Sequence, residues 1–246
     1  MIMTPARAHR ERQLAQLAAS QSASPAANRL GEAATEYASM RARLGVDLRR
    51  LSEIQSIENK IELKRELVPE YFEWCRGVLE ADTGAQDDVV SQLMIWGLDI
   101  GNWSFGLELA DYMIRHNLPL PERFDRTAPT LVCEEVADAA LKSLGQGETF
   151  PLAVLEWVES MVHGADIFDQ VRAKLHKALG LVQIGLADAI EPGSDGPAGM
   201  QRARLEVARD NLKRALELDS NSGVKKTLEQ LGRRIDKLTE QSTSAS

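Results

Sequence analysis

The chain has 246 residues, of which 43% are hydrophobic, 5% are aromatic and 27% are charged. This length allows one large domain or two small ones. The low content of aromatic residues favours helices over strands and predicts an all-α fold. No uncharged apolar run approaches the roughly 20 residues of a membrane span, and the N-terminus continues into charge instead of the apolar core of a signal peptide. We therefore expect a soluble, intracellular protein.

The net charge of −8 is unevenly distributed along the chain. Residues 1–65 hold 11 Lys and Arg against 7 Asp and Glu, residues 66–199 hold 8 against 23, and residues 200–246 hold 10 against 7. An acidic middle between two mildly basic ends fits a chain that offers its ends to nucleic acid and its middle to protein partners. Ordinary variation in solvated helix faces explains the same numbers.

The chain divides into four predicted segments. Residues 1–28 are expected to form a flexible arm, because ASQSASPAAN has no apolar period. Residues 29–66 follow as a helical hairpin or one bent helix, with Gly45 as a stop between the segments 29–44 and 46–67. Residues 67–240 are expected to form a helical body, and residues 241–246 a disordered tail.

An apolar stripe runs along the second segment of the predicted hairpin, at spacings of three and four residues. Such a stripe fits a self-association seam between copies of the chain. Packing against the next helix of the same chain explains it equally well. The candidate seam residues are Leu48, Leu51, Ile54, Ile57 and Ile61.

Two stretches resemble half-repeats of the tetratricopeptide kind. In the later stretch, Ala208, Leu212 and Ala215 have the small, bulky, small spacing of a second helix, and Leu179-Gly180 supplies the matching positions of a first helix. Because small residues let paired helices approach closely, we expect stacked helical hairpins with tetratricopeptide-like packing, and no long array. The earlier stretch keeps the same rhythm at Trp103, Gly106, Ala110 and Met113.

The sequence lacks the motifs of common catalytic sites. GQGETF at 145–150 has no lysine for a phosphate-binding loop, and neither the histidines nor the cysteines have metal-ligand spacing. The pairs Asp87-Asp88 and Glu134-Glu135 precede predicted helices, where carboxylates complement exposed N–H groups, so we expect helix caps and no nuclease centre. No catalytic residue, metal or cofactor is expected.

The tryptophans and cysteines are predicted as interior residues or ordinary side chains. Apolar helix patterns and a hairpin turn surround the tryptophans, which favours core anchors over base-stacking platforms. Cys75 and Cys133 are expected to be reduced thiols, since their spacing supports no disulfide framework. The four tryptophans are Trp74, Trp96, Trp103 and Trp157.

Basic residues remain as candidates for nucleic-acid contact, since affinity for DNA comes mostly from Lys and Arg at phosphates. One group lies in the predicted arm and hairpin, and a second shares one face of the last helix by spacings of seven and four residues. Both groups are also consistent with solvated faces. The first group is Arg7, Arg10, Arg12, Arg41, Arg43, Arg49, Arg50, Lys60 and Lys64, and the second is Lys226, Arg233 and Lys237.

Several long strings are hard to meet by chance: GAQDDVVSQLMIWGLDIGNWSFGLELADYMIRHNLPLPERFDRTAP from residue 84, then EEVADAAL, VRAKLHKALGL and SGVKKTLEQLGRRI. From about residue 60 to residue 235 the chain resembles the small terminase subunits of peduovirus-type temperate phages. The resemblance implies a packaging component in the host bacterial cytoplasm. Such a subunit recognises the cohesive-end site on double-stranded phage DNA, assembles with the large ATPase and nuclease subunit, and acts as a homo-oligomer.

The resemblance carries over no catalytic residue. Members of this family are labelled as the endonuclease subunit, which we interpret as participation in cleavage. Two alternatives stay open: a protein-interaction scaffold of the packaging complex without direct DNA contact, which the acidic middle favours, and a metal-dependent endonuclease.

Overall fold

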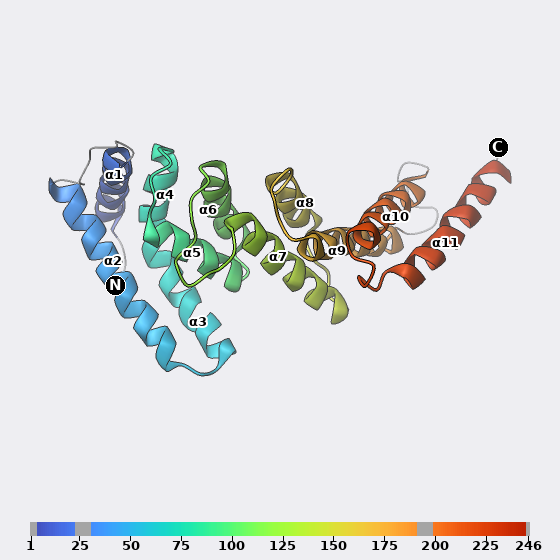
Figure 1. Cartoon of the computed structure of the whole chain (residues 1–246), viewed down its shortest axis with the longest axis horizontal. Coiled ribbons are helices and arrows are strands. Elements are labelled where there is room, and N and C mark those ends of the chain that lie inside the picture. Colours follow the sequence, from blue (N-terminus) through green and yellow to red (C-terminus); the bar gives the residue numbers. More distant parts are fainter. Residues whose placement is uncertain (1–3, 23–30, 191–198, 245–246) are drawn as a thin grey trace. The chain divides into compact units, whose positions relative to one another are not determined.

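The computed structural model describes residues 4–22, 31–190 and 199–244, which form α-helices and one short 3-10 helix without any strand. The predicted all-α class is confirmed. The chain divides into two compact units, Met1–Ala128 (unit 1) and Pro129–Ser246 (unit 2), whose helices are labelled in Figure 1. None of the described helices is both long enough and apolar enough to cross a membrane.

Unit 1 is built around a core of large aromatic and aliphatic side chains. Tyr71, Trp74, Trp96 and Tyr112 are all at most 2% exposed. In this unit α1 packs on α4 and α5 packs on α6. The elements are α1 (Pro5–Ser22), α2 (Gly31–Glu53), α3 (Ile57–Leu67), η1 (Val68–Tyr71), α4 (Phe72–Ala81), α5 (Asp88–Asp99) and α6 (Trp103–Arg115).

The predicted flexible arm is wrong for residues 5–22, which form α1; residues 1–3 and 23–28 of that prediction lie outside the described residues. The contact face of α1 consists of Leu14, Ala15, Ala18 and Ala19, all buried. Gly77 of α4 allows the close approach, because a Cβ there would lie 2.6 Å from the Ala15 Cβ and 2.4 Å from the Arg12 carbonyl oxygen. Alanines pack this helix, and their weak apolar signal is why the sequence pattern missed it.

The predicted hairpin of residues 29–66 turns at a different place. Helix α2 continues through Gly45 to Glu53, and the chain leaves the helix only at residues 54–56. Ser56 then caps α3, since its Oγ accepts a hydrogen bond of 3.4 Å from the Asn59 amide. Gly45 has helical dihedrals and a Cβ there would meet only the Arg49 side chain, so nothing at this position stops the helix.

The α5–α6 hairpin has the helix cap predicted for it and a close contact between two glycines. Asp87 caps α5, because its Oδ1 accepts hydrogen bonds of 2.9 and 3.1 Å from the Val89 and Val90 amides. Gly97 and Gly106 face each other across the two helices, and a Cβ on Gly97 would lie 2.8 Å from the Gly106 Cα. The two helix backbones therefore touch directly at this point.

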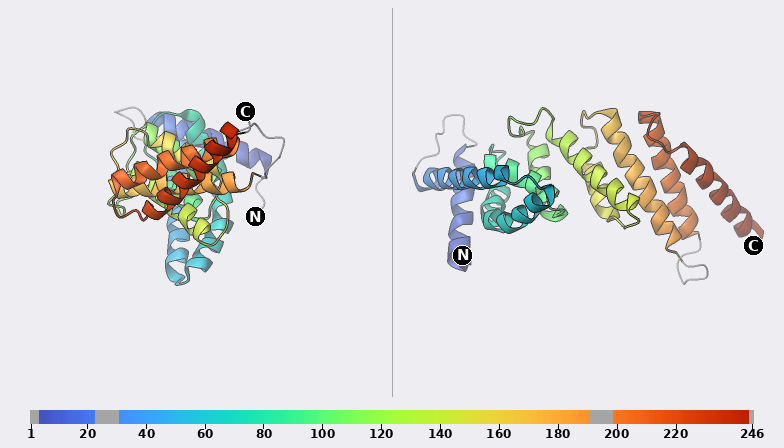
Figure 2. Two further views of the ribbon diagram at one scale, coloured as in Figure 1. Left: turned by 90° about the vertical axis from the view of Figure 1, so that its right-hand side faces the viewer. Right: turned by 90° about the horizontal axis from the view of Figure 1, so that it is seen from below.

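Unit 2 is a series of helices in which α10 packs against both α9 and α11 (Figures 1 and 2). Gly180 of α9 admits Leu212 of α10, whose side chain would be 2.7 Å from a Cβ at that glycine. The two helices are therefore in close contact at this point, while tetratricopeptide-like packing stays a prediction. The helices are α7 (Ala128–Gly145), α8 (Leu152–Met161), α9 (Asp169–Asp188), α10 (Met200–Leu218) and α11 (Lys225–Ser244).

Three sequence predictions in unit 2 need correction. Helix α7 begins at Ala128, so Glu134 and Glu135 lie in its second turn and do not cap it. Trp157 is 37% exposed on α8 and is not a core anchor, whereas Trp74 and Trp96 of unit 1 are. The predicted disordered tail overlaps α11, whose backbone is helical to Ser244, while residues 245–246 lie outside the described residues.

Glu11 of α1 is a buried carboxyl in unit 1, 5% exposed, and its Oε1 has no hydrogen-bond partner among the described residues. Burial raises its pKa above 4.5; Glu36 and Glu70 act in the same direction, and Arg7 and Arg43 oppose them. The folded state therefore binds this proton more tightly than the unfolded state. The resulting stabilisation is present below about pH 4.5 and is lost as the pH rises through the raised pKa.

We expect Glu11→Gln to raise the free energy of unfolding at pH 7.5 by about 1 kcal/mol, because it removes a buried charge. This gain should disappear as the pH falls toward 4, where the wild-type carboxyl is protonated in both states. Urea unfolding across this pH range measures the difference, and the exposed Glu66→Gln variant is the control. A gain that does not change with pH would contradict the assignment.

Candidate nucleic-acid interface

Six cations of the predicted N-terminal group are engaged in ion pairs within unit 1. Arg12 contacts Glu73 at 2.8 Å and Arg41 contacts Asp88 at 2.9 Å, so helices distant in the sequence supply the carboxylates. This part of the surface is therefore largely neutralised by its own acidic residues. The remaining pairs are Arg10 with Glu32, Arg43 with Glu70, Arg50 with Asp47, and Lys64 with Asp99.

Arg43 has several contacts within unit 1. Its guanidinium lies 2.8 Å from Glu70 and 5.0 Å from the centre of the Tyr71 ring. The hydrogen bond from Arg43 holds the pKa of Glu70 below its usual value. Tyr71 in turn donates a hydrogen bond of 2.7 Å to Asp47, and burial together with that bond raises the pKa of the Tyr71 hydroxyl. Arg43 thus stabilises the α2–η1 contact, and DNA phosphate would compete with these partners.

Arg7, Arg49 and Lys60 form no ion pair with any described residue. Arg49 lies near the end of α2 and Lys60 near the start of α3, on either side of the turn at residues 54–56. Arg7 and Arg49 are exposed and Lys60 is half-buried. Of the nine cations predicted in this region, these three remain open to an external anion.

The predicted self-association stripe does not lie on one helix. The turn at residues 54–56 places Leu48 and Leu51 on α2 and Ile57 and Ile61 on α3. Leu51 is buried within unit 1, as the alternative of intrachain packing requires, whereas Ile57 is 75% exposed. The seam, if formed between copies, has Ile57 as its most accessible residue.

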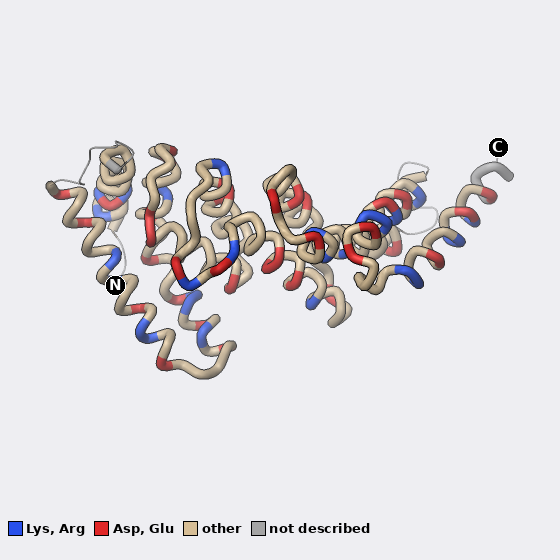
Figure 3. Tube along the Cα trace, viewed as in Figure 1, with Lys and Arg blue, Asp and Glu red and all other residues tan. Residues whose placement is uncertain are grey.

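The second predicted group lies together on α11. Lys226, Arg233 and Lys237 are exposed, and none of them forms an ion pair with a described residue. Leu231 and Ile235 occupy the opposite face of the helix and are buried in a core cluster with Leu205 and Leu212. The apolar contact with α10 therefore fixes this helix with its cations facing solvent. Lys and Arg recur along α11 in Figure 3.

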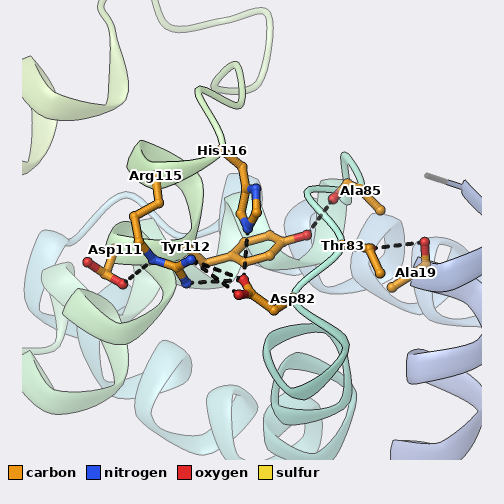
Figure 4. A network of polar contacts seen from close by, with 8 residues as sticks. All are labelled: Ala19, Asp82, Thr83, Ala85, Asp111, Tyr112, Arg115 and His116. Carbon is orange, nitrogen blue, oxygen red and sulfur yellow. Dashed lines mark hydrogen bonds and ion pairs between the residues drawn. The ribbon is translucent and has the colours of Figure 1, made fainter.

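A polar network not anticipated from the sequence joins α4, α6 and the loop between α4 and α5 (Figure 4). Asp82 accepts hydrogen bonds from Arg115 at 3.2 Å and lies 2.8 Å from His116 Nε2. The hydrogen bond with His116 and, to a smaller extent, the one from Arg115 lower the pKa of Asp82. Tyr112 donates to the Ala85 carbonyl at 3.0 Å, and Thr83 to that of Ala19 at 3.1 Å.

This network connects the end of α4 to the end of α6. Asp82 ends α4 with a φ of 45°, in the left-handed region, and its carboxylate then reaches the last turn of α6. Residues separated by more than 30 positions meet here, so no local spacing in the sequence indicates the contact.

The predicted thiols are confirmed as free cysteines, and both are buried. Burial raises the pKa of Cys133 to about 12 and that of Cys75 well above its ordinary value, so neither is a reactive thiolate near neutral pH. Within the described residues no three His, Cys, Asp or Glu side chains are placed to hold a metal ion together.

Comparison with known proteins agrees with the resemblance. Residues 41–170 match the phage small terminase subunit family. The chain is 36% identical over 232 residues to the "Terminase, endonuclease subunit" of Escherichia phage P2, a peduovirus, covering 94% of this chain and 85% of the relative. It is 22% identical over 217 residues to the "Probable terminase, endonuclease subunit" of Haemophilus phage HP1 (strain HP1c1), covering 82% and 72% of the two chains.

No solved structure matches the chain. The family match covers more than half of the sequence, and the identity to the phage P2 protein extends over nearly all of it. The chain therefore belongs to the phage small terminase subunit family, and its role lies in the packaging of phage DNA.

Proposed function

We propose that this terminase subunit binds double-stranded phage DNA at the cohesive-end packaging site through the exposed face of α11, and delivers it to the large subunit. One observation carries the proposal: Lys226, Arg233 and Lys237 face solvent without ion-pair partners among the described residues. A cation that has no carboxylate partner binds phosphate without first breaking an internal ion pair. The α11 face therefore takes precedence over the N-terminal group, in which six of the nine cations are engaged in ion pairs.

Arg49 and Lys60 form a second, weaker contact surface in this proposal. They flank the turn between α2 and α3 and lack ion pairs within the described part of unit 1. They lie on different helices, whereas the three cations of α11 share one face of a single helix. We expect this surface to increase the affinity for DNA, with α11 making the larger contribution.

Replacing Lys226, Arg233 and Lys237 together by alanine is expected to weaken binding to a cohesive-end duplex. Each lost phosphate contact should lower the slope of log affinity against log salt concentration by about 0.9, so the slope should fall by almost three if all three cations contact phosphate. Fluorescence anisotropy over a salt series, with full-length protein, measures both affinity and slope.

A matched control removes the same charge from the neighbouring helix. Arg202, Arg209 and Arg214 of α10 each pair with an acidic residue of their own helix. Their triple alanine variant should change the slope by less than one. Equal effects of the two triple variants would show that only net charge matters and would reject α11 as the contact surface.

A scaffold without direct DNA contact is the second candidate function. It is favoured by the ion pairs that neutralise Arg10, Arg12, Arg41 and Arg43 in unit 1. In that case the purified chain should co-purify with the large subunit but show no salt-dependent affinity for DNA. The anisotropy series therefore separates the two functions.

We further propose that the chain forms a homo-oligomer and takes part in cleavage as the DNA-recognising partner of the large subunit. The exposed Ile57 supports contact between copies, since a side chain 75% accessible gains from burial. Native mass spectrometry with and without duplex measures the assembly. Incubation of DNA and Mg²⁺ with each subunit alone, and with both, tests whether this chain cleaves by itself.

A further inference from the structure

Unit 1 contains an open cavity of about 690 Å³. It lies between α2, the N-terminal part of α5 and the loop that follows α6. This volume is in the range of small-ligand sites. The lining residues that carry the argument are Leu44, Leu48, Leu120, Gln92 and Arg123.

The cavity walls are apolar on two sides. Leu44 and Leu48 project from α2, and Leu120 stands between Pro119 and Pro121 in the loop. An aliphatic side chain placed between these walls would lose contact with water on both faces. Such walls suit a peptide better than the sugar-phosphate backbone of DNA, which stays hydrated in its complexes.

Gln92 supplies a buried donor to this cavity. Its side chain is 2% exposed, and its Oε1 accepts a hydrogen bond from Arg123. Because the oxygen is engaged in this way, the amide group has a fixed orientation at the cavity wall. The amide nitrogen of Gln92 carries two hydrogens that it can donate to an acceptor in the cavity.

Arg123 supplies a cation. Unlike Arg41, which also lines the cavity and pairs with Asp88 at 2.9 Å, Arg123 forms no ion pair with a described residue. Burial lowers the pKa of Arg123, with Asp99 opposing it, whereas the carboxylates of Asp111 and Asp82 raise the pKa of Arg115. The guanidinium remains charged near neutral pH. Asp88 and Glu122 also line the cavity, but Asp88 is paired with Arg41 and neither carboxylate forms an ion pair with Arg123.

We propose that this cavity binds an acidic peptide segment of a partner protein, in which a carboxylate is adjacent to an aliphatic side chain. Arg123 and the Gln92 amide hold the carboxylate, and Leu44, Leu48 and Leu120 enclose the aliphatic group. The site is independent of the DNA-binding surface proposed on α11. It gives the subunit a means of recognising protein while it binds DNA elsewhere.

The simplest probe is N-acetyl-leucine, which combines one carboxylate with one leucine side chain. Ligand-observed saturation-transfer NMR with the full-length chain should show contact at the leucine methyls, with a dissociation constant of about 1 to 10 mM for so small a ligand. N-acetyl-leucinamide has the same shape without the charge and should bind roughly tenfold more weakly. Absence of transfer to N-acetyl-leucine would overturn the proposal.

Arg123→Gln should weaken the binding of N-acetyl-leucine by roughly tenfold. Arg126→Gln, in the same loop but outside the cavity lining, should leave its affinity unchanged. Inorganic phosphate should compete poorly; competition at equal concentration would assign a general anion site and reject the peptide. Arg123→Gln should leave the DNA salt slope unchanged, so failure of this proposal is distinguishable from failure of DNA binding by α11. If a variant folds poorly, the difference in affinity between the two leucine probes on the unaltered protein still tests the site.

Discussion

Replacing Gly97 by alanine is expected to lower the free energy of unfolding of unit 1 by about 2 to 3 kcal/mol. The reason is the direct contact of α5 and α6, where a Cβ on residue 97 would lie 2.8 Å from the Gly106 Cα and 3.0 Å from its amide nitrogen. Backbone atoms cannot rotate away as a flexible side chain does, so the helices must separate. Urea unfolding followed by tryptophan fluorescence, with Trp96 buried on α5, measures the loss.

Gly45→Ala is the matched control in the same unit. Gly45 lies inside α2, and the nearest atom to an added Cβ is the tip of Arg49 at 3.8 Å. Alanine should therefore stabilise by about 0.5 to 1 kcal/mol, because it lowers the conformational entropy of the unfolded chain in a helical position. Destabilisation by both variants to a similar extent would mean that glycine itself, and not the contact with Gly106, is required.

Asp87→Ala is expected to cost about 3 kcal/mol. The substitution removes the cap of α5, which is usually worth about 1 kcal/mol, and leaves buried groups without an acceptor. Among these is Trp74, whose indole nitrogen lies 3.3 Å from Asp87 Oδ2, while the Val89 and Val90 amides lose their bonds to Oδ1. The melting temperature and the free energy of unfolding should fall together.

The adjacent Asp88→Ala variant removes the same chemical group from an exposed position. Asp88 forms a surface ion pair with Arg41 at 2.9 Å, which should be worth less than about 1 kcal/mol. A difference of about 2 kcal/mol between the two variants is thus predicted. Equal losses would indicate that general acidity near the helix start, and not the Asp87 geometry, stabilises α5.

Local patterns allowed part of this structure to be predicted from the sequence. Asp87 stands immediately before an apolar helix, which identifies a cap. The spacing of Ala208, Leu212 and Ala215 identifies a buried helix face, and all three are fully buried. In each case the information lies within a few residues, where helix geometry connects spacing to position.

The remainder depends on contacts between distant segments. Arg12 meets Glu73 and Lys64 meets Asp99 only because the fold brings their helices together, so the sequence could not show which cations were neutralised. Helix α1 was missed because alanines form its buried face. The cavity beside Arg123 requires three separate segments and has no motif of its own.

If α11 binds DNA as proposed, its two faces couple folding to binding through thermodynamic linkage. Leu231 and Ile235 are buried in the core cluster on one side, and Lys226, Arg233 and Lys237 are exposed on the other. If DNA binds only the packed helix, then each increase in duplex concentration above the dissociation constant raises the apparent stability of unit 2 logarithmically. The protein would then be most resistant to unfolding when its substrate is abundant, and added salt would weaken that protection.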